Sequence, residues 1–243
     1  EGSVSLNIGF FDLAGNPGSA VDNTTNGSAV RFDNTDPTLP SVTIASNNTL
    51  YTTMAKTGDN ITLSFTSSEA IQTPTVTIAG HDVTETGDNR TWSAVYTMVS
   101  TDSEEPVSLN IEFKDLAGNP GSAVTSTIGG SAVLFDKTPP ELTGVTEFTL
   151  PSADNRTSYT FNSNEAGTIN YGGSCSSSDN SDNSTSGGDK TITFDALADG
   201  THSNCVISLT DNASNTSVNL LVSPFTIGRL TPALYELTRV DTP

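Results

Sequence analysis

The sequence predicts an all-β protein built from tandem β-sandwich domains, and three observations support this prediction. Residues 1–39 and 104–142 align without a gap at a constant offset of 103 positions, with 27 identities in 39 positions. Apolar residues alternate with polar ones in short runs that turn residues separate, and no segment has the 3.6-residue period of a helix. A repeat of about a hundred residues is typical of whole domains in series.

Residues 1–36 are predicted to be the C-terminal half of an immunoglobulin-like domain. A strictly alternating strand runs through Val4, Leu6, Ile8 and Phe10. Residues 12–18 supply the Asp, Asn, Pro and Gly of a tight turn, and a second strand runs to about Phe32. Two strands cannot bury an apolar face by themselves, so we expect other sequence or another chain to complete this half.

Residues 37–139 are predicted to be one complete domain. Pro37 and Pro40 mark its entry. Alternating runs follow around Val42, Ile61, Val76, Trp92 and Val107, and a last strand is predicted from Val124 to Phe135. Turns are predicted at residues 57–60 and 86–89. About seven short strands in about a hundred residues indicate an immunoglobulin-like sandwich.

Residues 140–232 are predicted to be a second, divergent domain of the same kind. Residues 161–166 match residues 65–70, and residues 211–215 match residues 115–119, both at an offset of 96 positions. Residues 230–243 echo residues 138–151 at an offset of 92. We therefore expect residues 233–243 to be the first strand of a further immunoglobulin-like domain.

Cys175 and Cys205 are the two cysteines of the chain. An even pair in a Thr- and Asn-rich chain without helical periodicity indicates an oxidising compartment and one disulfide, with two free thiols as the alternative. Cys205 is in phase with Ile207 and Leu209 of a predicted strand, so the bridge should point into the core.

The charge of the chain limits its partners. The formal net charge is −19, with nine Lys and Arg against 28 Asp and Glu. Nucleic acids and anionic membranes require basic patches, so neither is expected as a partner. Divalent cations are favoured, although a saline habitat would select the same acidity. No apolar run is long enough to span a membrane, and since Glu1 corresponds to Glu104, we expect any targeting signal to lie outside this sequence.

Three motifs carry a resemblance to a known family. These are Ser-x-Glu-Ala at residues 67–70, Asp-Leu-Ala-Gly-Asn-Pro-Gly at residues 115–121, and Phe-Asp-Lys-Thr-Pro-Pro at residues 135–140. They resemble the bacterial Ig-like repeat domains of large secreted adhesins and cell-surface proteins. The resemblance implies tandem domains arranged as beads on a string, located outside the cell at its surface. It implies architecture more than function, because such repeats serve as spacers, adhesive tips and fibre subunits.

Calcium is the candidate ligand, because hard cations require several carboxylate and carbonyl oxygens at once. The resemblance implies sites at domain junctions, where linker and turn acids would meet. The candidate ligands are Asp12, Asp33, Asp36, Asp59, Asp115 and Asp136, with Glu69, Asp154 or Glu165 as possible additions. The alternative is that Asp12, Asp115 and Asp211 only satisfy the backbone of their own turns.

No enzymatic activity is expected from the sequence. His81 and His202 are the only histidines, and neither lies near a nucleophile motif. The sequence also lacks a phosphate-binding loop, paired metal-binding cysteines and a cofactor motif, so no catalytic or cofactor-binding residue is assigned.

Two functional hypotheses follow, both non-enzymatic. The first is a structural or adhesive extracellular repeat protein that forms a semi-rigid stalk at the cell surface. The second is a subunit of an extracellular filament or sheath, assembled by strand complementation between incomplete end domains. The expected partners are neighbouring repeats, other copies in fibres, and an unidentified host or surface ligand. A carbohydrate-binding or enzymatic accessory module is disfavoured, because it needs exposed aromatic residues and the single tryptophan, Trp92, lies in the phase of a core residue.

Overall fold

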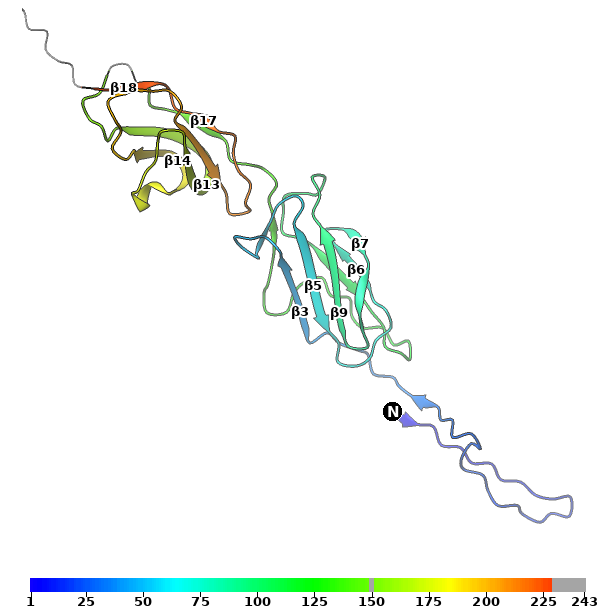
Figure 1. The fold of residues 1–243 in the computed structure, drawn as a ribbon. Coiled ribbons are helices and arrows are strands. Elements are labelled where there is room, and N and C mark those ends of the chain that lie inside the picture. The colour runs from blue at the N-terminus through cyan, green and yellow to red at the C-terminus, as the bar shows by residue number, and fades with distance from the viewer. Residues whose placement is uncertain (149–150, 229–243) are drawn as a thin grey trace, which may run out of the picture. The chain divides into compact units, whose positions relative to one another are not determined.

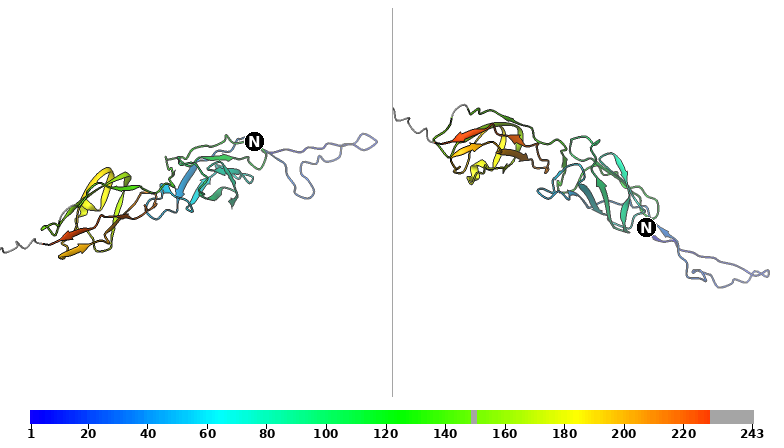
Figure 2. Two further views of the ribbon diagram at one scale, coloured as in Figure 1. Left: turned by 90° about the horizontal axis from the view of Figure 1, so that it is seen from above. Right: turned by 45° about the horizontal axis from the view of Figure 1, so that its top comes forward.

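The computed structural model describes residues 1–148 and 151–228, and in these residues the protein is almost entirely β-structure (Figure 1). The one helical element of this part of the chain is a short 3-10 helix, η1 (Asn180–Asp182). Two further views show the strands gathered into sheets (Figure 2). No helix in the described ranges is both long and apolar enough to cross a membrane.

The chain folds into two compact units. Unit 1 consists of residues 1–47 and 58–134, and unit 2 consists of residues 48–57 and the chain from Phe135 onward. The domain boundaries predicted after residues 36, 139 and 232 stay predictions. The further strand predicted at residues 233–243 lies outside the described residues.

Unit 1 contains two antiparallel sheets of more than two strands. The larger has the order β3-β5-β9-β8, with bounds Ser41–Ser46, Asn60–Thr66, Thr91–Thr97 and Glu85–Asp88. The smaller has the order β10-β6-β7, with bounds Leu109–Glu112, Thr75–Ile78 and His81–Val83. Two short strands lie outside these sheets: β4 (Met54–Ala55) belongs to the residues of unit 2, and β11 (Leu134–Phe135) spans the sequence boundary between the units.

The core of unit 1 follows the alternation of its strands. The larger sheet buries Val42, Ile44, Ile61, Leu63, Phe65, Trp92 and Ala94. The smaller sheet buries Val76, Ile78, Leu109 and Ile111. One buried face on each of two sheets is consistent with a β-sandwich.

Residues 1–32 form an open hairpin, drawn at the blue end of the chain (Figure 1). β1 (Gly2–Ser3) pairs with β2 (Arg31–Phe32), and isolated bridges join Ile8 to Val21 and Phe11 to Pro17. The apolar side chains along it stay exposed, among them Val4, Leu6, Ile8 and Phe10. This is the outcome expected of two strands that no second layer covers.

Unit 2 is built around a five-stranded sheet. Four strands follow the order β12-β13-β16-β17, with bounds Leu142–Gly144, Ser158–Gly172, Val206–Thr210 and Leu220–Leu221. The fifth, β14 (Ser184–Thr193), pairs with β13. A separate pair joins β15 (Gly200–His202) to β18 (Phe225–Ile227). The core gathers Tyr159, Phe161, Ile169, Ile192, Phe194, Ile207, Leu209, Val222, Phe225 and Ile227.

The predicted disulfide between Cys175 and Cys205 is present in unit 2. Both cysteines belong to the core cluster of this unit, so the prediction that the bridge points inward is confirmed. The bridge joins the loop after β13 to the residue that precedes β16.

Three sequence-based assignments are wrong. The strand predicted through Val4, Leu6, Ile8 and Phe10 is not continuous, because β1 ends at Ser3 and Ile8 forms one isolated bridge. The turn predicted at residues 86–89 is mostly strand β8, and the turn comes at Asn89 and Arg90. Gly87 allows β9 to approach closely, because a Cβ at this position would lie 2.9 Å from Trp92 Cα. The strand predicted from Val124 to Phe135 is reduced to β11 and one bridge at Val124, because Gly129 and Gly130 interrupt it with φ values of +95° and +80°.

Candidate metal centres

Three carboxylates converge in unit 1. Asp33 lies between β2 and β3, Glu69 follows β5, and Asp115 follows β10. One carboxylate oxygen from each residue lies within 4.8 Å of the other two. Asp115 is only 1% exposed, whereas Asp33 and Glu69 are half-buried. We call these three residues the first triad.

A tight turn holds the Asp115 carboxylate in place. Its Oδ1 accepts hydrogen bonds from the backbone N–H groups of Gly118 (2.6 Å) and Asn119 (2.8 Å), and its Oδ2 accepts one from Asn119 Nδ2 (2.6 Å). The Asp115 N–H donates to the Asn119 carbonyl at 3.0 Å. The alternative offered by the sequence, an aspartate that satisfies its own turn, is therefore correct as a description of the hydrogen bonds. The same bonds also fix where the carboxylate points.

Two amide side chains tie this turn to other segments of unit 1. Asn119 Nδ2 also donates to the Asp33 backbone carbonyl at 3.2 Å. Gln72 Nε2 donates to the Asp115 backbone carbonyl at 2.8 Å. These bonds to backbone carbonyls bring the connection to β3 and the segment after β5 to the turn, and Asn119 is held at the same time by the Asp115 carboxylate.

The like charges of the first triad are visible in its pKa shifts. Burial raises the pKa of Glu69, and the negative charges of Asp33 and Asp115 raise it further, against a smaller opposite effect of Arg90. Burial also acts to raise the pKa of Asp115, but the hydrogen bonds from Asn119 and Gly118 outweigh it, and the pKa of Asp115 is lowered. The turn thus favours the ionised form of Asp115, whereas burial and the neighbouring negative charges disfavour the ionised form of Glu69. A bound cation would offset the negative charges and favour the ionised form of Glu69 as well.

Unit 2 contains a second triad, formed by Asp136, Glu165 and Asp211. Asp136 is 103 positions after Asp33, and Glu165 and Asp211 are each 96 positions after Glu69 and Asp115. The ligand oxygens again lie within 4.8 Å of one another. Asp211 is 3% exposed, as deeply placed as its counterpart Asp115. The triad therefore recurs with the repeat.

The hydrogen bonds around the second triad repeat those of the first. Asp211 Oδ1 accepts from the Asn215 N–H (2.8 Å), and Oδ2 accepts from Asn215 Nδ2 (2.9 Å). Asn215 Nδ2 also donates to the Asp136 backbone carbonyl at 3.0 Å. Glu165 lies in β13 where the pairing with β14 shifts between Ser163 and Ala166. Such an irregularity can redirect a side chain out of the regular alternation.

Both triads suit a cation that prefers oxygen ligands. Calcium binds oxygens at about 2.3–2.6 Å, so two ligand oxygens of one ion are at most roughly 5 Å apart. The 4.8 Å limit in both triads satisfies this condition. All six side chains are carboxylates, and neither triad includes the His or Cys ligands typical of zinc sites. The two triads could therefore each hold a hard metal ion.

The structure distributes the sequence-predicted ligands unequally. Asp33 and Asp115 meet in the first triad, and Asp136 belongs to the second. The other three predicted ligands, Asp12, Asp36 and Asp59, belong to neither triad. Asp36 is exposed, and Asp59 is half-buried beside the start of β5.

Asp12 forms a third copy of the turn. Its Oδ1 accepts from the Ala14 and Asn16 N–H groups at 2.9 and 2.8 Å, and its Oδ2 accepts from Asn16 Nδ2 at 2.8 Å. Hydrogen bonds from Asn16 lower the pKa of Asp12. The turn thus forms in the exposed hairpin, without the partner acids that surround Asp115.

Sequence reasoning missed Asp211 as a candidate ligand and considered it only as a turn residue. The signal was available, because Asp211 and Asp115 are related by the same offset of 96 that relates Glu165 to Glu69. The offset of 96 positions thus predicts Asp211 from Asp115 as it predicts Glu165 from Glu69.

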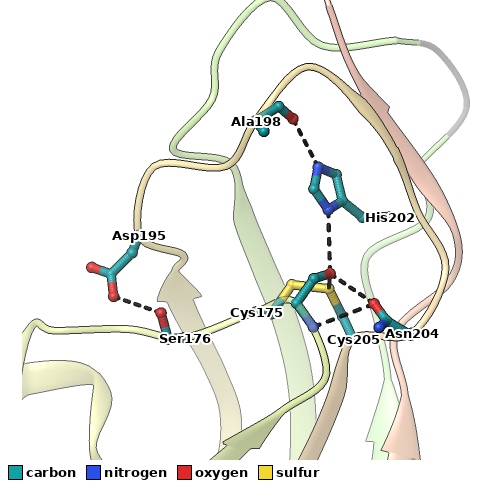
Figure 3. The surroundings of a disulfide bond; sticks show 8 residues. Cys175, Ser176, Asp195, Ala198, His202, Asn204 and Cys205 are labelled. Atoms are coloured by element: carbon teal, nitrogen blue, oxygen red, sulfur yellow. Dashed lines mark hydrogen bonds between the residues drawn. A yellow bond between two sulfur atoms is a disulfide. The ribbon is translucent and has the colours of Figure 1, made fainter.

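Neither histidine contributes to the triads. His81 Nε2 lies 2.9 Å from Asp102 Oδ1. In unit 2, His202 Nε2 lies 2.9 Å from the Ala198 carbonyl and its Nδ1 lies 3.2 Å from Ser174 Oγ. Figure 3 shows His202 above the disulfide and, to the left of the bridge, the hydrogen bond that Ser176 donates to Asp195.

Comparison of the sequence with models of known protein families and with curated proteins gives no match.

Proposed function

We propose that the protein is a non-enzymatic, extracellular repeat protein in which tandem immunoglobulin-like domains form a semi-rigid, calcium-binding stalk at the cell surface. The observation that carries the proposal is the recurrence of the acidic triad in both units, with the same turn and the same Asn-to-linker hydrogen bond. In a stalk of tandem domains, each domain is expected to carry the same stabilising site. An enzyme is expected to carry one active site, not the same site in each unit.

Each triad draws its three acids from parts of the chain that are far apart in sequence. Asp33 and Asp136 lie in the connections that lead into β3 and β12. Asp115 and Asp211 lie in turns after β10 and β16, while Glu69 and Glu165 come from the β5 and β13 regions. An ion bound to all three would cross-link these segments and stiffen the entry of the chain into each unit.

Three further features support an extracellular structural role. The chain has a buried disulfide, which persists in oxidising compartments. Its net charge of −19 keeps an extended surface protein soluble and attracts divalent cations. The three motifs of the repeat resemble those of adhesin domains, as described above.

Calcium binding is tested by isothermal titration calorimetry of the EDTA-treated chain. We expect two bound ions per chain, one for each triad. Asp115→Asn should remove one ion and Asp211→Asn the other, because an amide supplies a neutral and weaker ligand. The matched controls are Asp82→Asn and Asp199→Asn, at exposed positions outside the triads. No binding by the parent chain, or equal loss in the controls, would refute the calcium assignment.

The stalk is tested by negative-stain electron microscopy in calcium and then in EDTA. We expect separate, regular rods in calcium that bend or collapse in EDTA. The Asp115→Asn/Asp211→Asn double variant should look the same in both buffers. Rods that are indifferent to EDTA would keep the spacer role and remove calcium from it.

The exposed apolar hairpin of residues 1–32 favours a second candidate, a filament or sheath subunit that pairs strands with other chains. This candidate predicts long regular fibres in the same micrographs. It also predicts that deletion of residues 234–243, the expected complementing strand, abolishes them. Fibres that survive this deletion would refute strand exchange through that segment.

A further inference from the structure

The hairpin of residues 1–32 exposes side chains whose repeat equivalents are buried. Ile8 is 50% exposed and Phe10 is 51% exposed, whereas Ile111 and Phe113 are 0% and 5% exposed. The other arm shows the same contrast, since Val30 is exposed and its equivalent Val133 is buried. We call the face formed by Val4, Leu6, Ile8, Phe10, Val30 and Phe32 the acceptor face.

The acceptor face does not include every apolar residue of the hairpin. Leu13 is exposed, and its equivalent Leu116 is 68% exposed although unit 1 is complete around it. Phe11 is exposed as well, and a lysine, Lys114, stands at its equivalent position. Comparison of equivalent positions therefore distinguishes the residues that a partner would cover from the residues that stay exposed to solvent.

The backbone of the hairpin already has the register of its buried counterpart. Ile8 bridges Val21 as Ile111 bridges Val124. The Gly18 N–H donates to the Phe10 carbonyl at 2.8 Å, and the Gly121 N–H donates to the Phe113 carbonyl at 3.0 Å. The hairpin thus shares these pairings with residues 111–124 and needs no change in them to adopt the same structure.

A local contact also orients the aromatic ring at the centre of this face. A Cβ at Gly18 would lie 2.1 Å from Phe10 Cε2, and one at Gly121 would lie 2.2 Å from Phe113 Cε2. Each phenylalanine ring therefore rests directly on a glycine of its own hairpin. The ring is positioned before any partner arrives, which lowers the entropy lost on docking.

Unit 1 shows which elements pair with the equivalent residues 107–128. Strand β10 pairs with β6, with Leu109 opposite Ile78 and Ile111 opposite Val76. Farther along the hairpin, the Ile128 N–H donates to the Val42 carbonyl of β3 at 2.9 Å. Residues 41–78 thus supply both of these backbone partners, and a single strand equivalent to β3 would leave the β6 pairing unmade.

We propose that the acceptor face binds the first half of a repeat unit, a polypeptide segment with the sequence pattern of residues 33–103. Such a segment supplies both a β6-type edge for hydrogen bonding and the apolar side chains that are buried together with Ile111 and Phe113 in unit 1. The acceptor face is thus one side of a domain core whose other side comes from a separate stretch of polypeptide.

Docking would also complete a third triad. The segment carries counterparts of Asp33 and Glu69, and the acceptor hairpin carries the Asp12 turn with its carboxylate already bonded to Asn16. This consequence rests on the proposed calcium function, whereas docking itself rests only on the repeat.

The test joins a copy of residues 33–103 directly before Glu1 of the full chain. The junction keeps the natural register, because Glu1 corresponds to Glu104. Amide hydrogen exchange is measured by mass spectrometry in EDTA. We expect residues 4–21 to exchange at least about a hundredfold more slowly than in the parent chain, approaching residues 107–124, because core strands open far less often than exposed hairpins.

Two variants of the fused chain make the test specific. Ile8→Asp places a charge where the equivalent side chain is fully buried and should restore fast exchange in residues 4–21. Asn7→Asp adds the same charge at the neighbouring position, whose equivalent Asn110 points to the other side of β10, and should keep the protection.

Two outcomes would overturn the proposal. Unchanged exchange in the fused chain would show that the first half of a unit is not the occupant. Protection of residues 4–21 in the parent chain that grows with protein concentration would identify a second copy as the occupant instead. The calcium count is measured separately, so protection with no calcium bound by any chain would refute the calcium function and leave the docking intact.

Discussion

Glu69 is the residue at which burial and like charge act together. Its raised pKa means that the cation-free folded chain binds a proton more tightly than the unfolded chain, where the ordinary value is 4.5. The free energy of unfolding therefore falls as the pH rises from that value through the raised pKa, and the deficit persists at neutral pH. This loss of stability comes from the burial of Glu69 and from the negative charges of Asp33 and Asp115. A cation that binds the three carboxylates should therefore restore the stability.

The first prediction concerns Glu69→Gln, which removes this titration. In EDTA at pH 7, we expect the variant to unfold at a higher urea concentration than the parent, with the difference disappearing near pH 4. In calcium the order should reverse, because the variant lacks a charged ligand. The measurement is urea unfolding followed by circular dichroism, and Glu112→Gln, on the exposed side of β10, is the control. A variant that is less stable than the parent in EDTA at both pH values would contradict the role assigned to Glu69.

The second prediction concerns the backbone of the turn that holds Asp115. Gly118 has a φ of +99°, and a Cβ there would meet no atom within 4 Å, so any cost of substitution is conformational. We expect Gly118→Ala to lower the free energy of unfolding by about 1 kcal/mol. Gly118→Asn should cost less, because asparagine tolerates positive φ. Equal effects of the two substitutions would show that backbone conformation is not the cause.

The disulfide stabilises unit 2 by linking two of its strand regions covalently. It links the end of the β13 region to the start of β16, across a sequence separation of 30 residues. Closing a loop of that length stabilises the folded state by roughly 3–4 kcal/mol in the chain-entropy model.

The third prediction is that Cys175→Ala/Cys205→Ala lowers the stability of unit 2 by roughly this 3–4 kcal/mol and leaves unit 1 unchanged. Differential scanning calorimetry should show one transition moving to lower temperature and the other staying in place. Reduction of the parent chain with dithiothreitol should reproduce the shift. Equal movement of both transitions would contradict the assignment of the disulfide to one unit.

Strands were predictable from the sequence where one of their faces is buried. β3, β5 and β9 alternate because Val42, Leu63 and Trp92 point into the core. β8 escaped prediction because it pairs on one side only and none of its side chains is buried, so it has no apolar period. Periodicity reports burial rather than hydrogen bonding, and an exposed edge strand leaves no such signal.

At the scale of the whole molecule, the two triads should act as separate sites. An ion that binds only the folded state stabilises it by about 2.7 kcal/mol at a hundred times its dissociation constant. Our fourth prediction is that calcium raises both calorimetric transitions of the parent chain. Asp115→Asn should cancel the shift of unit 1 alone, and Asp211→Asn that of unit 2 alone. A single substitution that cancels both shifts would contradict two independent sites.

The sequence predicted part of the candidate site, but it did not show which of the candidate acids would meet. Asp33 and Asp115 were candidate ligands because they lie in the linker and the turn, and Glu69 was a possible addition. The sequence could not separate Asp33 from Asp36, three positions later in the same linker. That choice depends on the path of the linker, which the hydrogen bond from Asn119 to the Asp33 carbonyl fixes only in the folded chain.

Trp92, buried in the core of unit 1, gives this unit a fluorescence signal that unit 2 lacks. It is the single tryptophan of the chain, and its indole nitrogen has no hydrogen-bond partner among the described residues. Intrinsic fluorescence excited at the red edge of tyrosine absorption therefore originates from the first unit alone. The second unit contains no tryptophan and adds no signal of its own to that emission. The chain thus carries a built-in reporter for one of its two repeats, with no label required.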